Sequence, residues 1–325
     1  MLEWIIFIVV FFLYVHVIHQ YKSSEESDIY EYDYVENTNL QETCSMLQPF
    51  IFQSRDILPP PPLISSLEEG NLHVYDDPKK DPIQVPLKIA VELMTTSTSN
   101  KYYSEHNHEF LRDTEDFREQ VSEADPFLRP SFTVNSEYDL MIGEAGANVP
   151  LRYHVHTRRF MVIGGNEGKV SVKMVPWKKN RKHLHEIRDY DRGEYRSAID
   201  VWNPQEHHKR DIKKMDLLEF EIDAGNILYI PPYWGYSIRY QTTGTYMIEY
   251  TYSTLFNRIA FIGEIGRTYL QRSNIYHKVH RTLPMIQTDP VTQGTASPLQ
   301  DFVPMIQSET ETVSPISQEM FVAVE

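Results

Sequence analysis

Between residues 131 and 252 the chain is a succession of short apolar or alternating runs that glycine, asparagine and proline interrupt. In residues 169–175, Val170, Val172 and Met174 alternate with polar residues, a period of two that is typical of a strand with one buried face. Three further runs of this kind lie at 227–230, 236–241 and 246–252. Many short strands without intervening helices indicate a sandwich or a barrel.

Helices are expected on both sides of this strand region. Residues 108–125 place Phe110, Phe117 and Val121 at helical spacing among many charged residues, which predicts one or two short helices packed on the core. A second helical stretch is expected at 257–272. The fold class predicted from these patterns is therefore mainly β with helical extensions.

The N-terminus contains the longest apolar run of the chain, WIIFIVVFFLYVHVI at 4–18. A helix over 2–18 would span about 25 Å, which suits a thin bilayer. Glu3 precedes the run, and no small residue follows it, so a single-pass anchor is favoured over a cleaved signal peptide or a buried helix. Lys22 lies on the C-terminal side of this run, and a positive residue there favours a cytosolic location for the rest of the chain.

Changes in amino-acid composition divide the rest of the chain into segments. Residues 23–42 contain seven acidic residues and no lysine or arginine, and Pro59–Pro62 form a stiff spacer, so a tether is predicted. The polar tail repeats Pro-Met-Ile-Gln at 284–287 and 304–307, either as docking motifs or as a simple duplication. The predicted divisions are an anchor (1–20), a tether (21–62), an α/β extension (63–129), a barrel (130–255), a helical segment (256–282) and a disordered tail (283–325).

Charge and cysteine content exclude some classes of function. The net charge of −15 argues against a surface for nucleic acid. The single cysteine, Cys44, excludes an intramolecular disulfide and has no evident partner for nucleophilic catalysis.

Three stretches carry a family resemblance: PLRYH at 150–154, YRSAID at 195–200 followed by Asn203-Pro204, and AGNILYIPPYWGY at 224–236. Together they resemble the JmjC-like cupin family, which includes Fe(II)/2-oxoglutarate hydroxylases, and also membrane-anchored cupin-like proteins of large DNA viruses. The resemblance implies a double-stranded β-helix (jelly-roll) and a homodimer through 257–282. It also implies a virion or viral-factory membrane as the location.

The same resemblance shows which residues stand at the family's iron-binding and co-substrate positions. The family binds iron through an H-x-D/E pair and a later histidine, and the matching positions here are Arg152, His154 and Tyr236. Arginine stays protonated and cannot ligate a cation. In the family a lysine binds the 2-oxoglutarate carboxylate, but Val170 stands in its place, and Lys169 is expected to face outward.

One rearrangement could restore a metal site. His154 and His156 would share a strand face and supply two ligands. The third ligand would be Tyr236 or Glu249, although the alternation of side chains along a strand places Glu249 outward. The alternative is that these residues simply line the barrel.

Other polar groups are expected to be solvated loops. These are His183 with His185, His207 with His208, and the basic run at 178–182, which could also meet phosphate or lipid headgroups.

The sequence therefore predicts a membrane-anchored, non-catalytic ligand-binding or structural module without iron or 2-oxoglutarate, in which Arg152, His154 and Tyr236 hold an anionic ligand such as a carboxylate or sugar acid. The alternative is an Fe(II)/2-oxoglutarate hydroxylase with rearranged ligands. A third possibility is an assembly protein whose tether and tail bind protein partners.

Overall fold

The computed structural model describes residues 2–21, 28–32, 36–53, 70–189, 193–274 and 281–282. The prolines at 59–62 and the two Pro-Met-Ile-Gln segments lie outside these ranges.

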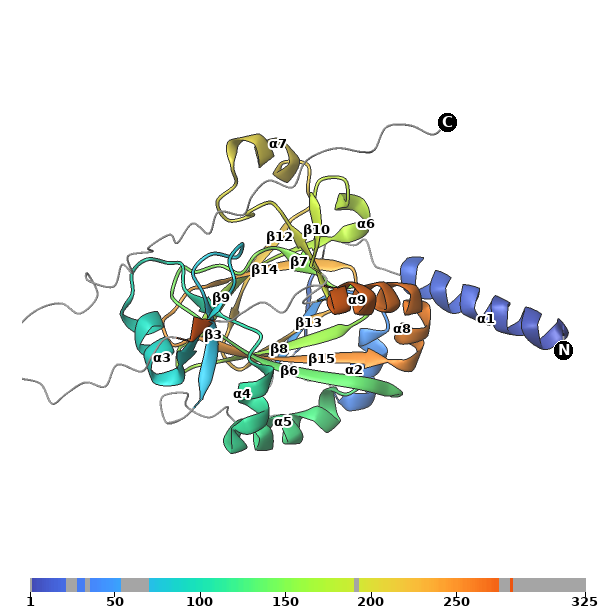
Figure 1. Ribbon diagram of the computed structural model, residues 1–325, viewed down its shortest axis with the longest axis horizontal. Helices are drawn as coiled ribbons and strands as arrows, with labels where there is room; N and C mark the ends of the chain where they lie inside the picture. Colours follow the sequence, from blue (N-terminus) through green and yellow to red (C-terminus); the bar gives the residue numbers. More distant parts are fainter. Residues whose placement is uncertain are drawn as a thin grey trace, which may run out of the picture. The chain divides into compact units, whose positions relative to one another are not determined.

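Two large sheets, mainly antiparallel, form the centre of the fold (Figure 1). The larger sheet has the spatial order β1 (Tyr30–Tyr32), β2 (Phe50–Gln53), β13 (Asn226–Ile230), β8 (Arg158–Gly164), β15 (Tyr246–Thr254), β6 (Thr133–Gly143), β5 (Tyr103–Ser104), β3 (Asn71–Tyr75), β4 (Ile83–Pro86) and β16 (Arg281–Thr282). The smaller sheet has the order β10 (Glu186–Asp189), β11 (Glu194–Ser197), β7 (Arg152–Tyr153), β14 (Trp234–Tyr240), β9 (Lys169–Pro176) and β12 (Leu218–Asp223). The expectation of a mainly β fold is confirmed, and the arrangement is compatible with a β-sandwich.

Helices precede, interrupt and follow the strands. They are α1 (Leu2–Tyr21), α2 (Asn37–Cys44), α3 (Leu87–Thr96), α4 (His108–Asp113), α5 (Glu115–Leu128), α6 (Trp177–Asn180), the 3-10 helix η2 (Glu206–His208), α7 (Lys209–Ile212), α8 (Leu255–Ala260) and α9 (Ile262–Asn274). The helices expected at 108–125 and 257–272 are confirmed as the pairs α4/α5 and α8/α9.

The two sheets pack through their inner faces. Met161 and Leu228 of the larger sheet belong to the same buried cluster as Val172, Trp234 and Ile238 of the smaller one. The alternation predicted for 169–175 is confirmed in β9, because Val170, Val172 and Met174 enter this cluster.

The outer face of the larger sheet is covered by helices. Leu40 of α2, Phe110 of α4 and Phe117 of α5 share a second cluster with Phe160 and Tyr250 of the sheet. In Figure 1, α4 and α5 lie along β6, on the side of the larger sheet away from β9 and β12. All nine residues of β15 are buried, so both faces of this strand are covered.

The tether expected over 21–62 needs a correction. Leu40 and Cys44 of α2 are fully buried, β2 pairs with β13, and the Tyr229 hydroxyl donates a hydrogen bond of 3.2 Å to the Cys44 carbonyl. The acidic residues dominate the average composition, but the apolar residues are concentrated where this segment meets the sheet. Part of the segment is therefore integral to the fold.

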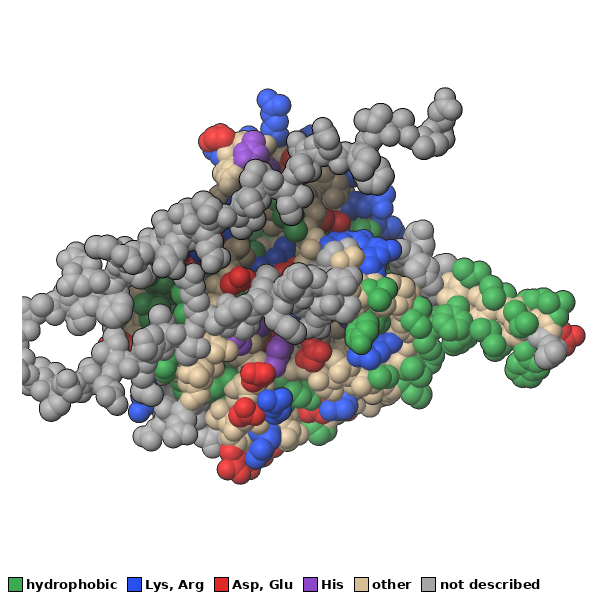
Figure 2. Space-filling view, in the orientation of Figure 1, with side chains coloured by type: hydrophobic (Ala, Val, Ile, Leu, Met, Phe, Trp, Pro, Cys, Tyr) green, Lys and Arg blue, Asp and Glu red, His purple; other side chains and the backbone are tan. Residues whose placement is uncertain are grey.

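Helix α1 exposes most of its apolar side chains, and they cover its surface in Figure 2. Near its end, Phe11 and Val15 pack against Tyr233 and Phe261. No helix within the described ranges is both long and apolar enough to cross a membrane.

Candidate functional site

The structure brings Arg152, His154 and Tyr236 together between the two sheets. Tyr236 of β14 lies directly opposite Arg152 of β7, and the guanidinium carbon is 5.5 Å from the centroid of the tyrosine ring. The His154 Nε2 atom is 3.4 Å from the Tyr236 hydroxyl. All three side chains are buried.

Two carboxylates that the sequence did not suggest surround Arg152. Its Nη2 is 2.7 Å from Glu105, and its Nη1 is 3.4 Å from Glu194. Arg196 lies opposite Arg152 on the neighbouring strand β11 and contacts the same two carboxylates. Like charges facing each other across strands repel. Glu105 and Glu194, each in contact with both arginines, offset that repulsion.

A second ion pair lies on the other side of His154. The Arg159 Nη1 is 2.6 Å from Glu249, and the Arg159 Nη2 is 3.1 Å from the His154 Nδ1. The Tyr236 hydroxyl donates to Glu249 at 3.4 Å. Three arginines therefore face three glutamates in one buried network, which we call the buried ion network: Arg152, Arg159, Arg196, Glu105, Glu194 and Glu249.

The outward orientation expected for Glu249 is wrong, because the side chain is 6% exposed and contacts Arg159. The alternation of side chains predicts which residues of β15 share a face. It identifies the inner face only when the residues of the other face are polar. Here the alternate residues, such as Ile248 and Tyr250, are also apolar and lie under the helices. The pattern along this strand is therefore ambiguous.

The protonation states follow from burial and these neighbours. Burial and the Arg159 charge hold the pKa of His154 well below its ordinary value, so the ring is neutral at pH 7. Burial alone would raise the pKa of Glu194, but Arg152 and Arg196 hold it well below its usual range. Glu105, whose pKa is also lowered, and Glu194 are therefore charged, and with the arginines they lie around a neutral imidazole.

The shared strand face expected for His154 and His156 is not formed. Strand β7 ends at Tyr153, and both histidines lie in the irregular segment that connects it to β8. Burial, followed by the Arg159 charge, lowers the pKa of His156 to about 4. Within the part of the chain that the structure describes, no three His, Cys, Asp or Glu side chains converge as a metal ion requires.

The residues matched to the co-substrate position behave as expected. Val170 is buried between the sheets, while Lys169 points outward and pairs with Glu221 at 2.6 Å.

The loop histidines lie close together, but the expectation that they are all solvated is wrong for His208, which is 8% exposed and lies beside the ring of His185. Asp211 accepts contacts from His183 Nδ1 at 3.0 Å and His185 Nε2 at 2.9 Å, and the rings of His207 and His208 are adjacent. Hydrogen bonds from His185 and His183 lower the pKa of Asp211.

The remaining sequence candidates offer no nucleophile. In the basic run at 178–182, Arg181 stacks over Trp177, and Lys179 lies 3.9 Å from Asp216. Burial raises the pKa of the Cys44 thiol to about 12, which leaves it unreactive at neutral pH.

Comparison of the chain with models of known protein families gives no match, and neither does comparison with curated proteins.

Proposed function

We propose that this chain is a non-catalytic, jelly-roll module of JmjC-like cupin type, held at a membrane by α1. The observation that carries the proposal is the buried ion network, in which Arg152 stands where the family resemblance would place an iron ligand.

The hydrogen bonds of His154 give the most direct argument against iron binding. A neutral imidazole has one acceptor nitrogen, and here the Nδ1 atom accepts from the Arg159 guanidinium. The other nitrogen, Nε2, then carries the proton and faces the Tyr236 hydroxyl. The lone pair that a metal would need is already used, and Arg152 and Arg159 on either side would repel a divalent cation.

The network also argues against an anion at Arg152 itself. Its charge is already met by Glu105 and Glu194, and the side chain is 3% exposed. An additional anion there would require displacement of a buried carboxylate. We therefore favour a structural role for Arg152, His154 and Tyr236.

One contact favours the alternative, an Fe(II)/2-oxoglutarate hydroxylase with rearranged ligands. The His154 Nε2 lies 3.8 Å from a Glu194 oxygen, so one histidine and one carboxylate are neighbours. If Arg152 moved away, these two groups and Glu105 could approach a metal.

Purified full-length chain loaded with Fe(II) under anaerobic conditions separates the two functions. We expect substoichiometric iron and no succinate release from 2-oxoglutarate. One iron per chain that is lost in His154→Ala, or succinate release above a heat-denatured control, would reverse the assignment.

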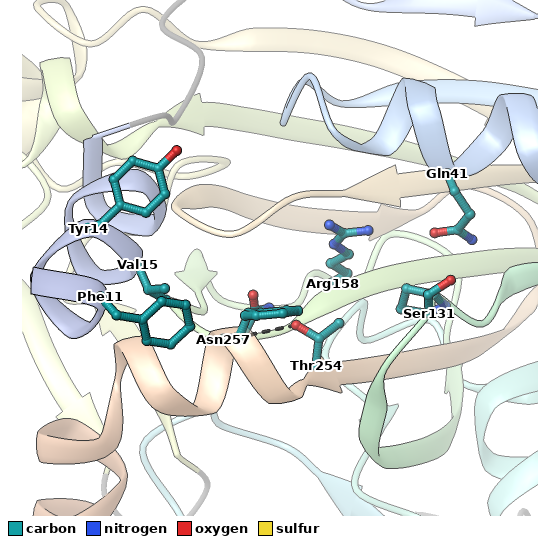
Figure 3. A pocket seen from close by; sticks show the side chains of 10 residues that line it. Phe11, Tyr14, Val15, Gln41, Ser131, Arg158, Thr254 and Asn257 are labelled. Atoms are coloured by element: carbon teal, nitrogen blue, oxygen red, sulfur yellow. Dashed lines mark hydrogen bonds between the residues drawn. The ribbon is translucent and has the colours of Figure 1, made fainter. Parts of the chain in front are cut away.

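The exposed apolar surface of α1 supports a membrane location. The apolar side chains and Tyr14 between residues 2 and 14 are 40% to 71% exposed on this helix, Phe11 excepted. A cavity of about 420 Å³ lies at the base of the helix, where Phe11, Tyr14 and Val15 face Arg158 (Figure 3). An arginine beside apolar walls suits the boundary between headgroups and acyl chains.

Liposome flotation tests this location. The chain should float with vesicles of neutral and anionic phospholipid, and the double substitution Ile8→Asp/Phe12→Asp should abolish flotation. Substituting two exposed residues remote from α1, Ile187→Asp and Ile89→Asp, provides the matched control and should leave flotation unchanged. Flotation of the α1 variant as well would remove the anchor from the proposal. Self-association through 257–282 and protein partners of the tail remain predictions.

A further inference from the structure

We propose that a cavity beside the smaller sheet binds a small organic anion, a molecule with a carboxylate or phosphate group on an apolar body. The cavity has a volume of about 800 Å³, within the range of small-molecule sites. Since it would give the non-catalytic module its ligand, the proposal rests on the function proposed above.

Segments far apart in the sequence form its walls. They are the loop after β3, the loop before β5, the residues that precede β7, the paired strands β10 and β11, and the segment that follows β11. The cavity therefore lies where the N-terminal extension meets the strand region. Ligand pockets often occur at such junctions, because two elements can supply different groups to one molecule.

Positive charge predominates in the lining although the chain as a whole carries −15. The lining cations are Lys79, Lys80, Lys101, Arg188 and Arg196, and the lining acids are Asp76, Asp189 and Asp200.

Two of these cations, Lys79 and Lys101, are available to a ligand. Lys80 and Arg188 are not, because Lys80 pairs with Asp76 and Arg188 pairs with Glu264. Lys79 and Lys101, by contrast, are exposed at the rim and have no ion-pair partner among the residues that the structure describes. Two unpaired ammonium groups from separate loops attract an anion and repel a cation.

The floor provides a hydrogen-bond donor that has no acceptor in the described part of the chain. Tyr103 is 1% exposed and stacks on Tyr75, yet its hydroxyl has no hydrogen-bond partner within the described chain. The Nη2 of Arg196 also makes no hydrogen bond there, but it lies 3.6 Å from Glu105, with which Arg196 forms an ion pair. Buried polar atoms are nearly always satisfied, so the Tyr103 hydroxyl in the wall of this cavity points to a ligand that accepts from it.

Apolar side chains complete the floor. Leu151, Ile199 and Val201 are almost fully buried and line the same space. A ligand that fits both parts has an anionic group near Tyr103 and the rim lysines, and an apolar or aromatic body against the aliphatic residues.

Isothermal titration of the full-length chain in detergent tests the site with three aromatic probes: phenyl phosphate, benzoate and the neutral benzyl alcohol. We expect saturable binding of at least one anion and none of benzyl alcohol. Lys79→Glu/Lys101→Glu should weaken anion binding at least about tenfold. Lys88→Glu, on the exposed side of α3 outside the cavity, is the control for charge reversal and should have no effect.

Tyr103→Phe tests the floor without disturbing the fold, since the hydroxyl it removes makes no hydrogen bond in the described chain. We expect about tenfold weaker anion binding with an unchanged melting temperature. Binding of phenyl phosphate alone would indicate phosphorylated ligands, and binding of benzoate as well would extend the class to carboxylates.

The proposal is overturned if neither anion binds, if benzyl alcohol binds equally well, or if the rim and floor variants match Lys88→Glu. Iron binding with succinate release would refute the non-catalytic function but leave these titrations unaffected, so the two failures are distinguishable.

Discussion

The two faces of the larger sheet are both buried but hold their neighbours in different ways. The outer face meets the helices through side chains such as Phe117, Phe160 and Tyr250. The inner face contributes Arg159 and Glu249 to the buried ion network, among apolar residues such as Met161 and Met247. Buried ion pairs give little net stability because the desolvation of both charges offsets their attraction, whereas apolar burial is directly stabilising. The comparison teaches that apolar burial stabilises both faces, and that the inner face alone adds a fixed arrangement of charges.

The largest expected effect tests the inner face. Arg159→Met leaves Glu249 buried without its cation and should lower the free energy of unfolding by about 3–5 kcal/mol in urea titrations. Arg159→Met/Glu249→Leu removes both charges and should restore stability to within about 1 kcal/mol of the parent chain. A double variant as unstable as the single one would show that the pair is itself stabilising, and the contrast between the faces would disappear.

The second expected effect is a loss of folding stability at acidic pH. Unfolded histidine binds its proton near pH 6.5, but folded His156 does so only near pH 4, so the unfolded state binds more protons between these values. The contribution of His156 is complete above pH 6.5 and is lost as the pH falls toward 4, by about 2 kcal/mol at pH 5. His154 should add to this loss, because its pKa is also lowered.

Urea midpoints at pH 7 and pH 5 measure this dependence, and His156→Gln should make it shallower. If the variant keeps the full dependence of the parent chain, His156 does not contribute to it.

A smaller effect tests the outer face. Ile248→Val removes one methylene from the cluster beneath the helices and should lower the free energy of unfolding by about 1 kcal/mol. The loss should be the same at low and high salt, because no charge changes. A salt-dependent loss would mean that the two faces are electrostatically coupled.

The smallest effect is expected at the surface. Lys169→Ala breaks an exposed pair with Glu221 and should leave the urea midpoint unchanged within error. A clear loss of stability would contradict the outward position of this lysine and with it the alignment of β9.

Local patterns in the sequence predicted much of the fold. Alternation located β9, and helical spacing located α4 and α5, because these elements each have one apolar side. Parity misassigned Glu249, since β15 is covered on both faces. The partners of Arg152 could not be predicted, because Glu105 and Glu194 reach it from distant segments through the tertiary fold. Average composition likewise hid the buried residues of α2.

The packing of α1 against the rest of the fold limits how the molecule could turn at a membrane. Phe11 and Val15 of α1 contact Tyr233 and Phe261. A bilayer that held the exposed part of α1 would therefore meet the same side of the molecule at all times. Insertion of a dozen flexible residues between α1 and β1 would leave this orientation unchanged, because the contacts of the helix fix it and the connecting residues do not.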